Sequence, residues 1–189
     1  MQVVMGDLNQ IHLADILKKS RASCDTIQAA VAYARKGHPL FEHCRESRVK
    51  LQLYVLDDGM GSADAGLLEE LFERGKAQVD CRVMHGHFHA KVIWWHGYGA
   101  YIGSANLTSA AWGKNVECGV FYSNAEVAKV GQSLKRLLNH LESAADPLTS
   151  DLIAQMREIE ERQAELTASP VKSSAPRDED DPELIYAKA

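Results

Sequence analysis

The residues best suited to do chemistry lie between positions 85 and 117 of the 189-residue chain. An imidazole and an ammonium stand two residues apart at His89 and Lys91, within a run that favours a β-strand over 89–95. Because alternate side chains of a strand share a face, this strand would present both groups together. Ser104 and Asn106 follow the next predicted strand and would add a hydroxyl and an amide at the same end of a sheet.

Side chains of these types are suited to holding a phosphate group. Lys91 would neutralise the phosphate charge, while Ser104 and Asn106 would donate hydrogen bonds to its oxygens. Gly103, which has no side chain, would let the backbone approach the phosphate closely. His89 would then stand ready as a nucleophile or an acid.

A carboxylate follows at Glu117, in the sequence Asn115-x-Glu117. A hydrogen bond from one ring nitrogen of His89 to this carboxylate would fix the tautomer of the imidazole and leave its other nitrogen free. We therefore expect His89, Lys91, Asn106 and Glu117 to be the catalytic residues. We expect Lys91, Gly103, Ser104 and Asn106 to bind the phosphate.

The spacing of these residues resembles the signature of the phospholipase D superfamily, H-x-K-x4-D-x6-G-S-x-N. His89, Lys91, Gly103, Ser104 and Asn106 occupy the matching positions, and Asn115-x-Glu117 resembles the nuclease branch of the family. One position departs from the signature, because His96 stands where the family has Asp.

The resemblance implies a metal-independent phosphodiesterase that needs no cofactor and works through a covalent phosphohistidine. In that family one motif histidine attacks phosphorus, and a second one protonates the leaving oxygen. This chain carries a single motif and no internal repeat, so the resemblance implies a homodimer in which two copies of His89 meet. The leading hypothesis is a nuclease that cleaves DNA or RNA, in a restriction, defence or DNA-processing system, with a helicase or another defence protein as a candidate partner.

Further residues near the motif are candidate substrate contacts. His87 and Lys114 would contact the substrate by polar or charged groups, and Tyr98 and Trp112, which we place in loops, would stack on unpaired bases. The histidines at positions 85, 87 and 89, with Cys81, leave a zinc site open as an alternative. Since a coordinated His89 would be unable to attack phosphorus, we expect no metal.

Composition and charge give the broader class. The chain is 46% hydrophobic and 25% charged, which is typical of a globular protein, and no apolar run reaches the ~20 residues that a membrane span needs. Residues 1–145 carry 16 Lys/Arg against 15 Asp/Glu, so the net charge of −5 comes from the C-terminal part. No secretory signal is present, and we expect a cytoplasmic protein without a membrane partner.

Periodicity predicts a mixed α/β fold, with a β-sheet flanked by helices. The resemblance implies that this fold is a phospholipase D-like half-unit that dimerises to complete the active site. The predicted strands cover 26–34, 49–56, 77–84, 89–95, 100–103 and 115–122. The predicted helices cover 8–23, 39–46, 64–74, 124–143 and 148–166. We divide the chain into a catalytic domain over 1–145, a C-terminal helix over 146–167 and a disordered acidic tail or linker over 168–189.

Two other functions stay open on the sequence. A lipid phosphodiesterase or phosphatidyl transferase would use the same motif chemistry, although such enzymes need apolar surface to meet a bilayer. A degenerate module that binds nucleic acid without cutting it is favoured only by His96, and the retained His89 counts against it.

Overall fold

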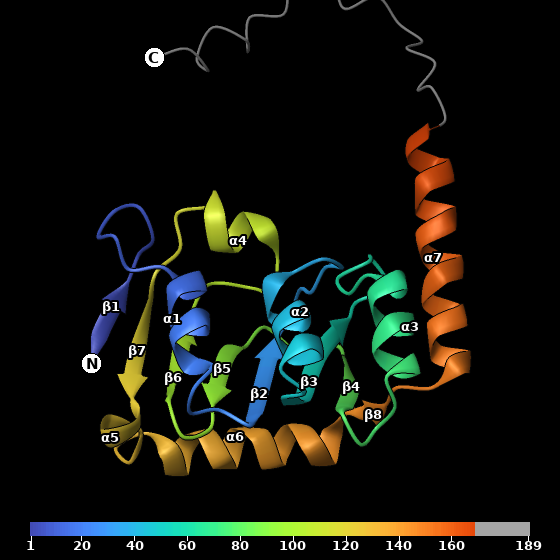
Figure 1. Ribbon diagram of the computed structural model, residues 1–189. Helices are drawn as coiled ribbons and strands as arrows, with labels where there is room; N and C mark the ends of the chain where they lie inside the picture. The colour runs from blue at the N-terminus through green and yellow to red at the C-terminus, as the bar shows by residue number, and fades with distance from the viewer. Residues whose placement is uncertain (169–189) are drawn as a thin grey trace, which may run out of the picture.

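The computed structural model describes residues 1–168, which form one eight-stranded sheet with helices on both faces (Figure 1). This arrangement confirms the predicted fold class. The strands are β1 (Gln2–Val4), β2 (Thr26–Val31), β3 (Lys50–Asp57), β4 (Val79–His85), β5 (Lys91–Trp95), β6 (Gly99–Gly103), β7 (Gly119–Ser123) and β8 (Asp146–Pro147). The helices are α1 (Leu13–Ser20), α2 (Pro39–Glu46), α3 (Ala65–Glu73), α4 (Ser109–Gly113), α5 (Asn124–Val127), α6 (Gly131–Ala144) and α7 (Ser150–Ala168).

The sheet is mixed, with strand order β1-β7-β6-β5-β2-β3-β4-β8. β2, β3 and β4 are parallel neighbours joined through helices, whereas β5, β6 and β7 form an antiparallel meander that adds to β2. Parallel neighbours need a crossover and antiparallel ones need only a turn. The parallel part of the sheet therefore lies where helices separate the strands in the chain, and the antiparallel part lies where the strands follow one another more directly.

Two hydrophobic cores fill the two faces of the sheet. One core joins α1, α2 and α3 to the inward side chains of β2 and β3, such as Ile27 and Leu53. The other joins Leu134 and Leu138 of α6 to the opposite face, where Tyr54 and Trp94 lie. Alternate side chains of a strand thus pack into different cores, and the central strands are buried on both faces of the sheet.

Several predicted boundaries were wrong, for local reasons. The helix predicted over 8–23 begins only at Leu13, because the preceding residues make a turn closed by a bridge between Gly6 and Ile11. The helix predicted over 124–143 is split into α5 and α6. Its start is capped by Ser123, which forms a capping box with Glu126. β1, α4 and β8 were not predicted.

The predicted C-terminal helix corresponds to α7, which packs on α3 at one side of the sheet and projects past the body of the molecule (Figure 1). Ile153 and Met156 anchor it in the core. Glu160 accepts a hydrogen bond of 2.9 Å from the backbone N–H of Ala65, at the start of α3. The tail predicted over 168–189 lies outside the described residues except for Ala168, which ends α7.

One edge of the sheet gathers the sequence motif. There β2 ends at Val31, which faces Lys91 at the start of β5, and β6 ends at Gly103, which faces Gly119 at the start of β7. We call this the motif edge. The loops that follow β2, β4 and β6 all emerge from it, together with α4 (Figure 1).

Candidate active site at the motif edge

His89 and Lys91 come from a loop and a strand, and not from one strand as predicted. Gly86, at a φ of 80°, turns the chain out of β4, and β5 begins only at Lys91. His89 is therefore an exposed loop residue, and the shared strand face does not exist. Instead, the Lys91 ammonium donates a hydrogen bond of 3.0 Å to the backbone carbonyl of His89, which holds the two residues together.

Lys91 is the buried charge of the site. Only 7% of the residue is exposed, and burial lowers its pKa, while the negative charge of Glu117 raises it. A buried ammonium must be compensated by hydrogen bonds or opposite charge. The carbonyl of His89 and the carboxylate of Glu117 supply that compensation in the absence of a substrate.

Glu117 forms its hydrogen bonds with partners other than the predicted one. Its carboxylate accepts from the Ser104 hydroxyl and from the Asn115 side-chain amide, the latter at 3.2 Å. Within residues 1–168, the ring of His89 makes no hydrogen bond; its side chain meets the Tyr33 ring edge-on at 6.4 Å between centroids. The predicted bond between Glu117 and His89 is therefore not formed within one chain.

Ser104 and Asn106 are tied to the strands and loops around them. The Ser104 hydroxyl accepts a bond of 3.0 Å from the backbone N–H of Cys118 while it donates to Glu117. The Asn106 side-chain oxygen accepts a bond of 3.0 Å from the backbone N–H of Tyr33. This bond orients the amide, so its NH₂ group is left as the donor. β2 ends at Val31, earlier than predicted, and the backbone of Tyr33 bonds to Asn106 and Leu107 instead of a neighbouring strand.

Gly103 is a glycine because of packing. A Cβ placed on Gly103 would collide with the Tyr101 ring and lie 2.6 Å from the Cα of Gly119, and a Cβ on Gly119 would meet the same ring. Tyr101 is fully buried, and its hydroxyl accepts a bond of 3.2 Å from the backbone N–H of Ala105. The two glycines thus let Tyr101 lie across the ends of β6 and β7 and fix the loop that carries Ser104.

The predicted substrate contacts divide into two groups. His87 and Lys114 are exposed near the motif edge, and Trp112 on α4 is partly buried there. Tyr98 lies instead in the turn between β5 and β6, at the opposite end of these strands, where it packs on Phe121 at 5.6 Å between ring centroids. The sequence places Tyr98 in a loop, but only the strand direction shows that this loop is at the wrong end.

His96, the departure from the family signature, also lies at the opposite end from the motif edge. Its Nε2 is 2.7 Å from the Gln28 side-chain oxygen, and its ring stacks on Trp94 at 4.5 Å between centroids. Burial lowers the pKa of His96. His96 is therefore remote from the side chains that would meet a phosphate.

The histidines considered for zinc do not converge. His85 lies 3.5 Å from Asp57 and 3.2 Å from Asp146, at the end of β4, while His87 and His89 follow Gly86 into the loop. Residues 1–168 contain no group of three or more His, Cys, Asp and Glu side chains placed to hold a metal ion.

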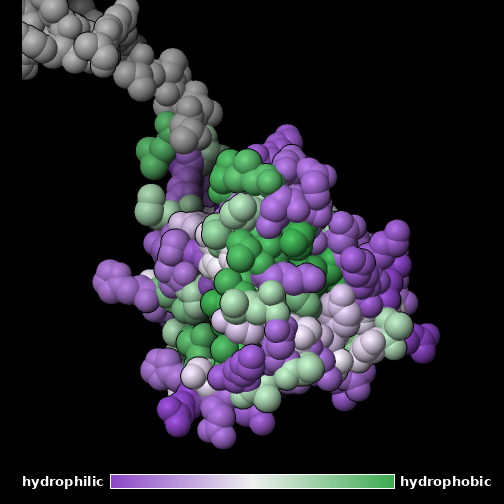
Figure 2. All heavy atoms as spheres, turned by 90° about the vertical axis from the view of Figure 1, so that its left-hand side faces the viewer, coloured by the Kyte–Doolittle hydropathy of each residue, from purple (hydrophilic) through white to green (hydrophobic). Residues whose placement is uncertain are grey.

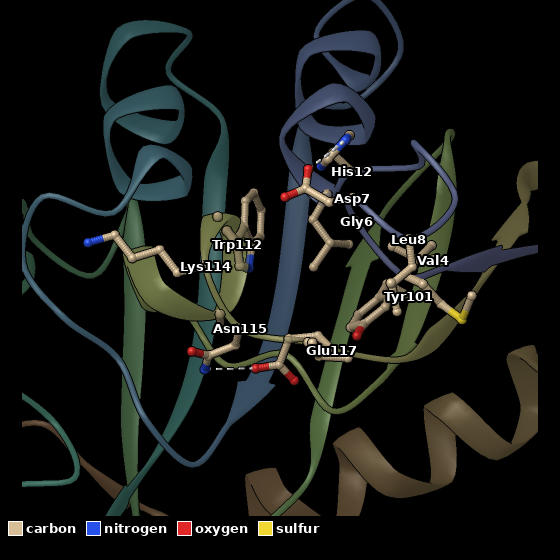
Figure 3. Close-up of a pocket in the computed structure, with 15 residues that line it drawn as sticks. Val4, Gly6, Asp7, Leu8, His12, Tyr101, Trp112, Lys114, Asn115 and Glu117 are labelled. Atoms are coloured by element: carbon tan, nitrogen blue, oxygen red, sulfur yellow. Dashed lines mark hydrogen bonds and ion pairs between the residues drawn. The ribbon is translucent and has the colours of Figure 1, made fainter.

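A pocket that the sequence did not reveal adjoins the motif edge (Figure 3). It has a volume of about 110 Å³ and lies between the N-terminal segment, the start of α1 and the chain from α4 to β7. Glu117 and Asn115 line one end of it, and Trp112 lines a side. Lys114 contributes to the rim, but its ammonium points away from the interior (Figure 3).

Comparisons with known proteins agree with this fold. Residues 13–138 match the family model described as "Cardiolipin synthase, PLD-like domain". No curated protein matches the sequence significantly.

Among solved structures, the fold is similar to Nuc, a phospholipase D family member from Salmonella typhimurium, with a TM-score of 0.59 and 18% identity over 79% of this chain and 97% of Nuc. NucT from Helicobacter pylori gives a TM-score of 0.60 and 13% identity over 78% of this chain and 98% of NucT. Phosphatidylserine synthase from Haemophilus influenzae gives a TM-score of 0.62 and 13% identity. The similarity covers 88% of this chain but only 46% of the synthase. At these identities the likeness establishes the shared fold.

Proposed function

The chain belongs to the phospholipase D-like family, a family of phosphodiesterases, and from this premise we propose that it is a metal-independent nuclease that works as a homodimer. The observation that carries the proposal is the motif edge itself. There a buried ammonium at Lys91, an exposed imidazole at His89 and the hydroxyl and amide of Ser104 and Asn106 converge from separate loops and strands.

Each group has a task in the proposed reaction. Lys91 and the Asn106 amide bind the phosphate oxygens and stabilise the negative charge that develops on them. One ring nitrogen of His89 attacks phosphorus, the bond from phosphorus to the leaving oxygen breaks, and a phosphohistidine remains. Ser104 donates its hydroxyl proton to Glu117, so we assign to it the positioning of the motif loop and not a hydrogen bond to the phosphate.

The leaving oxygen needs a proton from an acid, and a second copy of His89 is the group we assign to this task. The same histidine then takes a proton from water as the water attacks phosphorus and releases His89. A second copy must supply this group because residues 1–168 hold a single motif. The unsatisfied ring of His89 and its exposure favour such a meeting of two copies across a two-fold axis.

A nuclease is favoured over a lipid enzyme by the match in length. The chain covers nearly all of Nuc and NucT but less than half of the phosphatidylserine synthase. Within residues 1–168, no helix is long and apolar enough to cross a membrane. A role beside a helicase or in a defence system stays a hypothesis from the sequence.

The lipid alternative is favoured by the description of the family model and by the similarity to the synthase. Figure 2 shows hydrophobic side chains gathered on the face that carries β1, and the exposed large hydrophobic residues of this region are Val3, Leu8 and Val116. Release of headgroup from phospholipid vesicles, with no cleavage of nucleic acid, would favour this second function.

The proposal is tested by cleavage of single- and double-stranded DNA and RNA in excess EDTA. We expect the wild type to cut, and His89→Ala to lose at least about 1,000-fold in rate, because the nucleophile is gone. His140→Ala, which removes an exposed histidine on α6, is the matched control and should cut normally. Cleavage that EDTA abolishes, or cleavage by His89→Ala at the wild-type rate, would overturn the mechanism.

A further inference from the structure

The reaction proposed above does not use the pocket beside the motif edge, although Glu117 belongs to both the pocket and the motif edge. Glu117 lines the pocket and at the same time accepts the hydrogen bond of Ser104, a residue of the motif. Only the Glu117 side chain would therefore separate a group in the pocket from the Ser104 side of the phosphate site. Whatever is attached to the scissile phosphate is the natural occupant of such a position.

The size of the pocket restricts this occupant. Its volume of about 110 Å³ is well below the ~300 Å³ at which pockets for drug-sized ligands begin. Figure 3 shows Trp112 on one side of the pocket and Val4, Leu8 and Tyr101 on the other. A volume of this size suits a single ring and is too small for a base pair.

Trp112 is held in place for this role by a buried neighbour. The ring of His38 meets it edge-on, with centroids 4.3 Å apart and planes at 87°. His38 is fully buried and is the N-cap residue of α2. Its Nδ1 accepts a hydrogen bond of 3.3 Å from the backbone N–H of Leu40. Since one part of the indole packs on this anchor, the part that lines the pocket is a preformed stacking surface.

Both ends of the pocket are polar. His12 and Asp7 lie together at one end, 3.8 Å apart, and Asn115 and Glu117 lie at the other (Figure 3). A ring with hydrogen-bonding groups on its edge suits this pattern of apolar sides and polar ends. An acyl chain suits it less well, because it would desolvate the Asn115 amide and the Glu117 carboxylate and would offer no hydrogen bond to the capacity that their mutual contact leaves unused.

From these observations we infer that the pocket binds one unpaired nucleobase of the substrate, next to the scissile phosphate, with Trp112 as its stacking partner. The inference rests on the proposed nuclease function and adds a substrate class to it, namely single-stranded nucleic acid. A duplex would have to release the base from its pair before the pocket could take it, which costs free energy.

The test uses wild-type protein and a series of single-stranded oligonucleotides with one defined cleavage position, each carrying a single abasic site at a different place. We expect the rate of cleavage to fall by about tenfold when the abasic site adjoins the scissile phosphate, as the loss of one stacked base predicts. Abasic sites three or more nucleotides away should leave the rate unchanged. A flat profile along the series would overturn the inference.

Trp112→Ala provides the second arm. It should cut the intact oligonucleotide about tenfold more slowly and should lose the abasic penalty, because the stacking partner is already missing. Trp112→Phe, which keeps an aromatic ring, should retain most of the penalty. Phe72→Ala removes an exposed aromatic residue from α3 and is the matched control, with the full wild-type penalty expected. A penalty that persists unchanged in Trp112→Ala would assign the base to another site.

Failure of this inference can be told from failure of the proposed function. Wild-type hydrolysis of bis(p-nitrophenyl) phosphate in excess EDTA reports the phosphodiesterase reaction without any nucleobase. If that reaction proceeds and the abasic profile is flat, the pocket assignment is wrong and the nuclease mechanism stands. If neither this substrate nor any nucleic acid is cut, the proposed function itself fails.

Discussion

A short chain of charges and hydrogen bonds links the residues of the motif edge. Lys91 is buried and would lose its proton more easily than an exposed lysine, and Glu117 opposes this loss. The same carboxylate accepts hydrogen bonds from the Ser104 hydroxyl and the Asn115 side-chain amide. Glu117 is therefore a positioning residue that keeps the ammonium charged and the motif loop in place, and the predicted contact with His89 is not required for this.

Replacement of Glu117 by Gln should make activity more sensitive to alkaline pH. The protonated form of Lys91 is the one that binds phosphate, and removal of the neighbouring negative charge lowers the pKa of Lys91 further. The alkaline limb of the pH–rate profile should accordingly move to lower pH. Glu73→Gln, on the exposed surface of α3, should leave the limb where it is. If the alkaline limb does not move in Glu117→Gln, the Glu117 carboxylate has no effect on the pKa of Lys91.

At the scale of elements, the site is built by short segments between the strands. α4 carries Trp112 to the pocket and is fixed to α2 by the contact with His38. Burial lowers the pKa of His38 from its ordinary value of 6.5 to about 3, and its Nε2 is buried without a hydrogen-bond partner within residues 1–168. The imidazole must be neutral in the folded protein, so this junction between helices depends on pH.

The stability of the fold should fall between pH 6.5 and pH 3 because of His38. In this window the unfolded chain binds a proton that the folded chain excludes, so acid favours unfolding by up to about 1.4 kcal/mol per pH unit. His38→Asn keeps a capping side chain for α2 without a titrating group. Urea unfolding at pH 7, 6, 5 and 4 should show a shallower loss of stability for this variant than for the wild type.

The exposed His140 supplies the comparison for this experiment. His140→Asn should lose stability with acid as steeply as the wild type, because it replaces an exposed residue and leaves the buried His38 in place. A His38→Asn variant with the same slope as the wild type would show that His38 takes up its proton without unfolding.

On the scale of the whole molecule, all loops that carry the motif emerge from one end of the sheet. The N-terminal segment lies at one side of this end, and α7 projects past it at the other (Figure 1). His89 is exposed in the loop that follows β4 at this end of the sheet. The proposed second copy would have to approach this end for the two histidines to meet, so the dimer and the active site would form together.

Mixing experiments should reveal such a shared site. After subunit exchange, one part of wild type with nine parts of His89→Ala should have an activity per wild-type chain about tenfold below that of wild type alone, since most wild-type chains would pair with an inactive partner. Excess His140→Ala should not suppress the wild type in this way. Constant activity per wild-type chain, or full activity of a monomer in sedimentation, would exclude a shared site.

The family and the fold class could be predicted from the amino-acid sequence, and the side chains of the candidate site could be proposed from it. His89, Lys91, Ser104, Asn106 and Glu117 were chosen by type and spacing, which are properties of the chain alone. The alternation of helices and strands predicted the mixed sheet, because periodicities of 3.6 and 2 reflect which side chains are buried.

How these groups meet could not be predicted from the sequence and became visible in the folded chain. The tertiary structure showed that Glu117 bonds Ser104 and not His89, that Tyr98 and His96 lie at the far end of the strands, and that Gly103 makes room for Tyr101. It also formed the pocket from the N-terminal segment and α4, which are about 100 residues apart in the chain. Such contacts depend on strand direction, register and the path of loops, and local sequence patterns do not encode distances between remote segments.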